Sequence, residues 1–171
     1  MDRIAKFKKV SYKQYVKAYT NEFCENTITD MSCVKEMYEH ISIPLRATKG
    51  SAGYDFSTPF DICLKPGESI KVPTGIRCKI DEGWVLMCFP RSSMGFKYRM
   101  QIDNTVGIID SDYYYAENEG HIFIKISNNG NKIFKLKAGD KFAQGIFVSF
   151  GITNDDMAND ERTGGIGSTG K

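Results

Sequence analysis

The stretch IRCKIDEGWVLMCF, residues 76–89, decides the fold class of this chain. Apolar and polar side chains alternate over residues 76–80, Asp81 and Gly83 supply a turn, and an apolar run follows over residues 84–89. Alternation with a period of two is typical of a β-strand that buries one face. The stretch therefore predicts two short strands joined by a tight turn.

The region on the C-terminal side of this stretch has the same character. Residues 122–126, 132–136 and 143–150 are short apolar or alternating runs, and the turn sequence NNGN, residues 128–131, separates the first two. Many short strands at close spacing are characteristic of β-sandwiches and jelly rolls. We therefore expect a mainly β fold, with residues 44–150 forming a jelly-roll barrel or sandwich.

Two amphipathic helices are expected before the β-rich region. In residues 11–23, large apolar side chains recur at spacings of three and four, and Ser11 with Gln14 matches a capping box. A second helix is expected to follow Asp30, a favourable N-cap residue, and to end before Pro44. Residues 1–43 are thus predicted to be a helical extension. We expect its aromatic stripe to pack on the core or on a neighbouring subunit, and the sequence assigns it no function.

Composition indicates one domain and nominates no class of partner. The chain has 171 residues, of which 41% are hydrophobic, enough for a single sizeable core. Its net charge of +2, with both signs mixed, offers no broad basic surface for nucleic acid. We find neither an apolar signal segment nor a run of transmembrane length, so we expect a cytoplasmic protein that does not bind membranes.

The cysteines and histidines form no pattern typical of a metal site. The five cysteines are an odd set without C-x-x-C spacing, and only two histidines accompany them. We therefore expect reduced and mostly buried thiols.

Residues 151–171 predict a tether followed by a glycine-rich arm. Residues 153–161 are polar and acidic, with too few apolar side chains to bury themselves. The run RTGGIGSTGK, residues 162–171, combines the Arg162 cation, the hydroxyls of Ser168 and Thr169 and unhindered glycine N–H groups, which suits a polyphosphate. A terminal segment without function is the alternative. Residues 165–171 also match G-x-x-x-x-G-K, but a P-loop requires a following helix, so that fold is not expected.

Three segments of the β-rich region carry polar groups that a sandwich does not need for stability. PRSSMG, residues 90–95, places a guanidinium and two hydroxyls at the end of a strand, which suits an anion or, alternatively, a plain Ser-rich turn. NTVGIID, residues 104–110, contains Gly107, which marks a bulge or a nearby ligand, and ends at Asp110, which alternatively caps a turn. Gln144 lies amid apolar residues and needs hydrogen-bond partners, from a ligand or from the core.

Five segments taken together resemble the trimeric dUTPase family. They are GSAGYD (50–55), PRSS (90–93), NTVGIIDSDY (104–113), GDKFAQ (139–144) and RTGGIGSTG (162–170), in the order and rough spacing of that family's motifs. The resemblance implies a jelly-roll homotrimer that hydrolyses dUTP to dUMP and pyrophosphate with Mg²⁺, in sites shared between subunits. Such an enzyme limits uracil incorporation into DNA and supplies dUMP for thymidylate synthesis.

The same resemblance implies a role for each matching residue. Asp110 is the catalytic residue, which would orient and polarise the water that attacks the α-phosphorus. Tyr113 would lie against the deoxyribose and exclude a 2′-hydroxyl, Asp55 would support the site, and Mg²⁺ would be held by phosphates and waters without a direct protein ligand. The remaining substrate-binding residues are Asn104, Gly107 and Ile109 for uracil, Arg91, Ser92, Ser93 and Gln144 for the phosphates, and Arg162, Ile166, Ser168 and Thr169 of the arm.

Two departures from the family pattern bear on the site. The arm is one residue shorter, with Ile166 where an aromatic side chain usually covers uracil, which forgoes a stacking contribution of about 1–3 kcal/mol. An insertion lies between Tyr113 and Gly120, so the tyrosine that contacts the sugar is ambiguous. Tyr113 fits the family pattern without a gap, and Tyr115 is the alternative. We hypothesise that Tyr114, Tyr115 or His121 replaces the missing aromatic.

Two other functions compete with dUTP hydrolysis. The dCTP deaminases share the fold and an R-S-S motif, but their proton shuttle is a glutamate where this chain has Lys125. A dUTP-binding sensor would use the loop from Tyr113 to Gly120, or the N-terminal helices, to contact a protein partner. The presence of Asp110 together with Arg91 and Gln144 favours the hydrolase.

Overall fold

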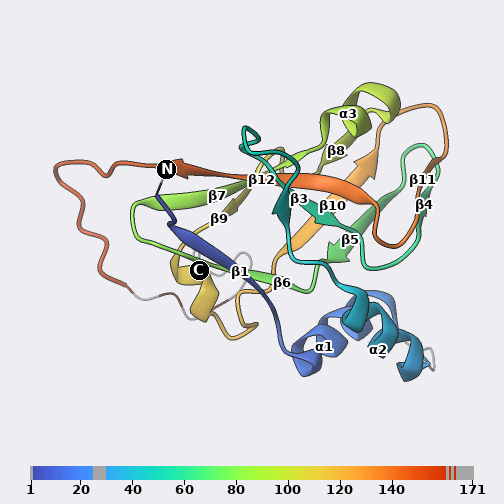
Figure 1. The fold of residues 1–171 in the computed structure, drawn as a ribbon, viewed down its shortest axis with the longest axis horizontal. Coiled ribbons are helices and arrows are strands. Elements are labelled where there is room, and N and C mark those ends of the chain that lie inside the picture. Colours follow the sequence, from blue (N-terminus) through green and yellow to red (C-terminus); the bar gives the residue numbers. More distant parts are fainter. Residues whose placement is uncertain (1, 25–29, 161, 163, 165–171) are drawn as a thin grey trace.

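Figure 1 shows the fold in a computed structural model, which describes residues 2–24, 30–160, 162 and 164. The largest sheet is antiparallel, with the strand order β2-β3-β12-β7-β9. These strands span Leu45–Arg46, Tyr54–Ser57, Lys141–Ser149, Trp84–Pro90 and Gly107–Ile109.

Smaller antiparallel sheets complete the β-structure. One has the order β5-β10-β8, and the others pair β11 with β4 and β1 with β6. Their strands span Ser69–Pro73, Phe123–Asn128, Met100–Ile102, Phe134–Leu136, Ile62–Leu64, Ala5–Lys9 and Ile76–Ile80. The prediction of a mainly β, jelly-roll fold is confirmed. In the described part of the chain the sheets form a sandwich and not a closed barrel, which was the alternative.

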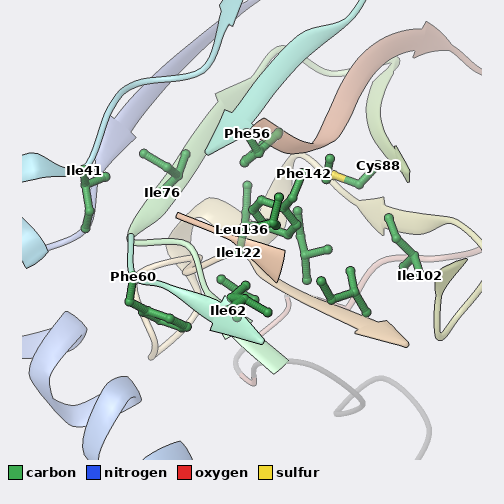
Figure 2. Close-up of a cluster of buried hydrophobic side chains, with 14 of the residues drawn as sticks. Ile41, Phe56, Phe60, Ile62, Ile76, Cys88, Ile102, Ile122, Leu136 and Phe142 are labelled. Carbon is green, nitrogen blue, oxygen red and sulfur yellow. The ribbon is translucent and has the colours of Figure 1, made fainter. Parts of the chain in front are cut away.

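The hydrophobic core lies between these sheets. Figure 2 shows Phe56 of β3, Phe142 of β12 and Ile122, which directly precedes β10, in one cluster. The alternation predicted for residues 76–80 is present, since Ile76, Cys78 and Ile80 are buried and the intervening residues are not. Burial of alternate side chains is what holds a strand to one register, because a shift by one residue would turn all of them to the solvent.

The helices α1 (Tyr12–Phe23) and α2 (Met31–His40) begin where the sequence predicted. Ser11 Oγ accepts a hydrogen bond from the Gln14 amide at 3.1 Å, and Asp30 Oδ1 accepts one from the Ser32 amide at 2.9 Å. Only half of the expected capping box is formed, because the Ser11 amide donates to the Glu119 carboxylate at 2.7 Å instead of to a side chain of its own helix.

The helical pair packs its aromatic stripe on the core of its own chain. Tyr15 and Val34 are fully buried, and the ring of Phe23 lies 5.3 Å from that of Phe60. Gly75 allows this close approach: its φ is +71°, and a Cβ there would lie 2.2 Å from Cδ1 of Ile41. Glycine is therefore required at this position both for its backbone conformation and for space.

Three elements differ in type from the structure that the sequence predicted for their regions. Strand β1 lies within the segment expected to be helical, and the short helices α3 (Ser92–Tyr98) and η1 (Asp112–Tyr115) lie within the region expected to be strands and turns. The lysine-rich sequence of β1 is extended because it pairs with β6, far along the chain. Helix α3 contains Gly95 and is only seven residues long, so local pattern gave no helical signal.

The expectation of mostly buried cysteines is wrong. Cys78 and Cys88 are buried, and burial raises the pKa of both thiols to about 12. Cys33 and Cys63 are exposed, and Cys24 is half-buried. Surface cysteines are compatible with the fold because these positions lie on helix and strand faces turned away from the core. Within residues 2–24 and 30–160, no helix is long and apolar enough to cross a membrane.

Candidate active site

Asp55 and Gln144 lie on neighbouring strands of the large sheet, and Arg91 follows directly after the end of β7. Gln144 of β12 pairs with Asp55 of β3 on one side and with Phe89 of β7 on the other. All three line a pocket of about 750 Å³. Side chains from three segments distant in sequence are thereby presented to one concave surface, as a ligand site requires.

The carboxylate of Asp55 holds two cations at this pocket. Its Oδ1 lies 3.1 Å from Arg91 Nε, and its Oδ2 lies 2.8 Å from Lys141 Nζ. The Asp55 side chain is only 9% exposed, whereas its two cationic partners are partly open to water, so a largely buried carboxylate orients the guanidinium. A phosphate placed in the pocket would meet Arg91 already directed by a second side chain. Lys141 was not among the predicted site residues.

Gln144 satisfies its hydrogen-bonding needs in part within the protein. Its Nε2 donates to the Pro90 carbonyl at 3.3 Å. A Cβ on Gly53 would lie 2.6 Å from its Oε1, so the absence of a side chain at Gly53 makes room for the amide. The protein therefore supplies one hydrogen-bond partner for Gln144, as one of the two alternatives predicted. Gln144 also lines the pocket, where a ligand as its second partner stays a prediction.

The two serines of PRSS begin helix α3. Ser92 lines the pocket of Asp55 and Arg91, whereas Ser93 lines an adjoining pocket of about 440 Å³ together with Lys97 and Lys141. Arg91 borders both pockets. Ser92 thus shares a pocket with one basic side chain and Ser93 shares a pocket with several, an arrangement that suits an anion better than the plain turn considered above.

The residues predicted to read a base lie in the turn that joins β8 to β9 and on β9 itself. Thr105 in this turn has a φ of +66°, and the Val106 amide donates to the Asn104 carbonyl at 2.7 Å. Gly107 pairs with Cys88, and a Cβ on Gly107 would lie 3.2 Å from the Cβ of Cys88. Gly107 therefore marks a close approach of β9 to β7. The pairing is regular there, so the bulge predicted as one alternative is absent, and the nearby ligand stays a prediction. Ile109, two residues on, packs against the core.

Asp110 lies apart from the pocket of Arg91 and is paired with the arm. Arg162 Nη2 donates to Asp110 Oδ2 at 2.9 Å, and Arg162 Nε lies 3.3 Å from Asp112 Oδ1. The guanidinium carbon is also 5.5 Å from the ring centroid of Tyr113. Arg162 is thus brought to the catalytic candidate of its own chain. The positions of Ile166, Ser168 and Thr169 lie outside the described residues.

Tyr113 is buried rather than presented to the solvent. Its hydroxyl donates to the His121 carbonyl at 2.7 Å and accepts from Asn118 Nδ2 at 2.8 Å. Burial raises the pKa of Tyr113, against the opposing effects of Asn118 and Arg162. One face of its ring is covered by Arg162, so a sugar could contact that face only after Arg162 has moved.

The insertion leaves one of the three proposed replacement aromatics accessible. His121 is fully buried, so the hypothesis that it covers a base is wrong. The Tyr114 ring is stacked 3.7 Å from the Arg77 guanidinium. Tyr115 is 70% exposed and borders a pocket of about 770 Å³ beside Arg162. Arg77 was not predicted, because nothing in the local sequence shows that β6 passes beneath this loop.

The two groups of candidate residues are separated along the large sheet. Ile109 pairs with Leu86, so Asp110 lies level with Val85, six residues from Arg91 along β7. At about 3.3 Å per residue this is about 20 Å. In Figure 1 the yellow segment that follows β9 lies well away from the labelled helix α3. This backbone separation exceeds the combined length of an aspartate and an arginine side chain, so the Asp110 carboxylate and the Arg91 guanidinium of one chain do not meet.

The described residues contain no group of three or more His, Cys, Asp or Glu side chains placed to hold a metal ion. A cage made only of protein ligands is therefore not available in this part of the chain. Mg²⁺ commonly binds through substrate phosphates and retained waters, which requires few protein ligands.

Comparisons with family profiles, related sequences and solved structures all find dUTPases. The dUTPase family profile matches residues 39–170. The deoxyuridine 5′-triphosphate nucleotidohydrolase of Lactococcus lactis subsp. lactis (strain IL1403) is 39% identical over 133 residues, covering 76% of this chain and 89% of the relative. The dUTPase of Streptococcus mutans has a TM-score of 0.63 at 32% identity, covering 86% of this chain and 98% of that chain.

A more distant structural neighbour concerns the fold alone. It is a mutant dUTPase from phage phi11 of S. aureus, solved to show the coordination of a structural Mg(II) ion. The TM-score is 0.59 at 23% identity, and the alignment covers 73% of this chain and 94% of that chain.

Proposed function

The chain belongs to the dUTPase family, and on this premise we propose that it hydrolyses dUTP to dUMP and pyrophosphate at sites built jointly by copies of the chain. The observation that supports shared sites is the separation of Asp110 from Arg91 and Gln144 by about 20 Å along β7. Because the Asp110 carboxylate and the Arg91 guanidinium of one chain do not meet, a second copy would supply either the carboxylate or the phosphate-binding pocket. A homotrimer is the assembly we propose.

Asp110 would act by orienting the attacking water toward the α-phosphorus and accepting its proton. Nearly half of its side chain is exposed, so a water can reach the carboxylate once Arg162 withdraws. Such general-base assistance contributes about 10²- to 10⁴-fold. The remaining rate enhancement would come from alignment and from neutralisation of phosphate charge.

The triphosphate would lie in the pocket of Arg91, Ser92 and Gln144, with Ser93 beside it. Asp55 keeps the Arg91 guanidinium oriented, so binding would cost little side-chain ordering. The arm would close over the outer phosphates through Arg162, Ser168 and Thr169, with Ile166 over the base. Closure of such an arm excludes water and governs turnover.

The turn and strand that carry Asn104, Gly107 and Ile109 would bind the uracil edge. Gly107 lies close to β7, so this backbone has little room to move away from a base with an added methyl group, which supports rejection of thymine. Tyr113 would contact the deoxyribose after Arg162 leaves its ring. We keep Tyr115 as the candidate for covering the base, because its side chain is exposed at the neighbouring pocket.

We propose that Mg²⁺ enters bound to the triphosphate. The described residues offer no cluster that fits a metal ion held by the protein alone, so we assign no step to a protein-bound metal. When bound to the phosphates, Mg²⁺ supplies neutralisation of their charge. A cytoplasmic location remains a prediction.

A deaminase role is not supported by the position of Lys125. Its ammonium pairs with Asp103 at 2.9 Å on an exposed strand face, and a lysine held in this way cannot replace the glutamate that shuttles protons in deamination. No contact among the described residues favours the alternative of a dUTP-binding sensor over the hydrolase.

The activity is tested by measuring pyrophosphate release from dUTP with Mg²⁺, against dCTP, dTTP and UTP, for the wild type and Asp110→Asn. We expect turnover of dUTP alone, reduced about 10²- to 10⁴-fold by the substitution. Tight binding of dUTP without pyrophosphate release would instead indicate a sensor.

Sharing of the site is tested by complementation. Asp110→Asn and Arg91→Ala chains, each inactive alone, are co-expressed with different tags and purified as mixed oligomers. We expect activity to reappear, because some sites then combine Arg91 of one chain with Asp110 of another. A site contained in one chain would stay inactive in every mixture.

A further inference from the structure

Glu119 connects the N-terminal helices to the loop that follows Asp110. Its carboxylate accepts hydrogen bonds from the Ser11 amide at 2.7 Å and from Ser11 Oγ at 2.5 Å. Ser11 is the residue that caps α1, and it lies 108 positions away in sequence. Figure 1 shows that α1 follows strand β1 along the chain. The start of the helical pair is therefore attached to this loop by a side chain.

The backbone at Glu119 indicates that this attachment is maintained against strain. Glu119 has a φ of +59°, in the left-handed region that residues with a Cβ seldom adopt. Gly120 follows with a φ of +65°, and a Cβ there would lie 2.6 Å from the Tyr113 carbonyl oxygen. Such strained residues persist only where surrounding contacts hold them, and they are frequent at functional sites.

Arg77 extends the connection from Glu119 to η1. Its Nη1 lies 3.9 Å from Glu119 Oε2, its Nη2 donates to the Tyr114 carbonyl at 2.5 Å, and its guanidinium stacks on the Tyr114 ring. Two contacts then fix the adjacent tyrosine, since Asn118 donates to the Tyr113 hydroxyl and that hydroxyl donates to the His121 carbonyl. The ring of Tyr113 is thus placed by a chain of contacts that begins at Ser11.

We propose that Glu119 is a positioning residue through which the N-terminal helices place Tyr113 and thereby set discrimination between a deoxyribose and a ribose. The inference rests on the proposed function, because Tyr113 is assigned to the sugar there. Glu119 itself touches no substrate. Its loss would let η1 shift, and a displaced Tyr113 would no longer crowd a 2′-hydroxyl.

The variants are chosen to separate positioning from stability. Glu119→Asn removes the long carboxylate but tolerates the left-handed backbone. Glu119→Gln is the conservative variant, since it keeps one acceptor for Ser11 and loses only the charge. Ser11→Ala removes the hydroxyl that bonds Glu119 and caps α1. Asp30→Ala is its matched control, because it removes the cap of α2 without touching the loop.

The first measurement is the ratio of kcat/KM for dUTP to that for UTP. We expect Glu119→Asn and Ser11→Ala to lower this ratio about tenfold or more, as expected when a site loses a steric contact. Glu119→Gln should give a smaller loss, and Asp30→Ala should leave the ratio within about twofold. An equal loss of activity on both nucleotides, or the same change in Asp30→Ala, would overturn the proposal.

The second measurement does not depend on activity. Amide hydrogen exchange over residues 112–116 should accelerate in Glu119→Asn and Ser11→Ala and stay unchanged in Asp30→Ala. A wild type that hydrolyses no dUTP would overturn the proposed function, whereas unchanged exchange in the Glu119 variant would overturn the positioning role by itself.

Discussion

The guanidinium of Arg162 and the carboxylate of Asp110 form an ion pair of 2.9 Å within one chain, although the sequence places them 52 residues apart. The pair occupies the carboxylate that the proposed reaction assigns to the attacking water. The proposed reaction therefore requires Arg162 to separate from Asp110 before the carboxylate can bind the attacking water.

A double-mutant cycle measures this pair. Since Asp110 is 47% exposed, we expect Arg162→Ala and Asp110→Asn to be non-additive in the free energy of unfolding by up to about 1 kcal/mol. The coupling should disappear when a non-hydrolysable dUTP analogue saturates the protein. Denaturant unfolding at one fixed protein concentration provides the values, and coupling that persists with the analogue would contradict the separation.

Asp55→Asn should weaken substrate binding, because it frees Arg91 from its nearly buried partner. Loss of a charge-assisted bond of this kind costs about 1.5–3 kcal/mol, which corresponds to a KM for dUTP raised tenfold or more. Steady-state kinetics provide the check. Asp61→Asn is the matched control: its exposed carboxylate pairs with Lys137 at 2.6 Å, away from the pocket, and should leave KM unchanged. An equal effect of both substitutions would contradict a role at the site.

Gly107→Ala should disturb the segment that is proposed to bind uracil. The added Cβ would lie 3.2 Å from the Cβ of Cys88, so β9 and β7 must separate by a few tenths of an ångström. Overpacking of this kind costs about 1–3 kcal/mol of stability, and affinity for a dUTP analogue should fall as well. Gly95→Ala adds the same methyl group where nothing lies within 4 Å, in α3. Calorimetry should show it to be neutral or stabilising, and a similar loss in both variants would contradict the steric explanation.

Stability should depend on His121 between pH 4 and 6.5. Burial lowers the pKa of His121 to about 4, against a smaller opposing effect of Glu119, while the unfolded chain keeps the usual value of 6.5. Between these values the unfolded state binds a proton that the folded state does not. The neutral, buried His121 therefore makes its full contribution to the free energy of unfolding above about pH 6.5. This contribution falls by about 3 kcal/mol as the pH is lowered to 4.

His121→Gln tests this dependence, because a glutamine oxygen can still accept the Gly75 amide that His121 Nε2 accepts at 2.8 Å. The pH dependence in this window should flatten in that variant. His40→Gln, which changes an exposed histidine on α2, should leave it intact. Chemical denaturation at several pH values gives the slopes, and a slope that survives His121→Gln would show that another group is responsible.

Much of the fold was predictable because its signals are local. The alternation of Ile76, Cys78 and Ile80 identified β6, and Ser11 and Asp30 marked the starts of both N-terminal helices. Strand β1 was missed because its lysine-rich sequence gains its order only by pairing with β6. Helix α3 was missed because a short segment containing glycine carries no helical periodicity.

The site was predictable as a set of residue types but not as an arrangement. Asp55, Arg91 and Gln144 do meet at one pocket. Tyr113 is buried, which its sequence did not indicate. His121 is also buried, contrary to the hypothesis that it covers the base. Arg77, Glu119 and Lys141 were missed, since each is an ordinary charged residue whose partner lies far along the chain.

The sequence by itself determined the strand-rich core, the starts of the helices and the residues that can carry phosphate chemistry, because alternation, caps and motifs are properties of neighbouring residues. Only the tertiary structure decided that Asp110 lies about 20 Å from Arg91, that Arg162 pairs with Asp110, and that Ser11 holds Glu119. Those relationships depend on which distant strands pair and in which register, and that choice is made by burial of the whole core rather than by any one segment.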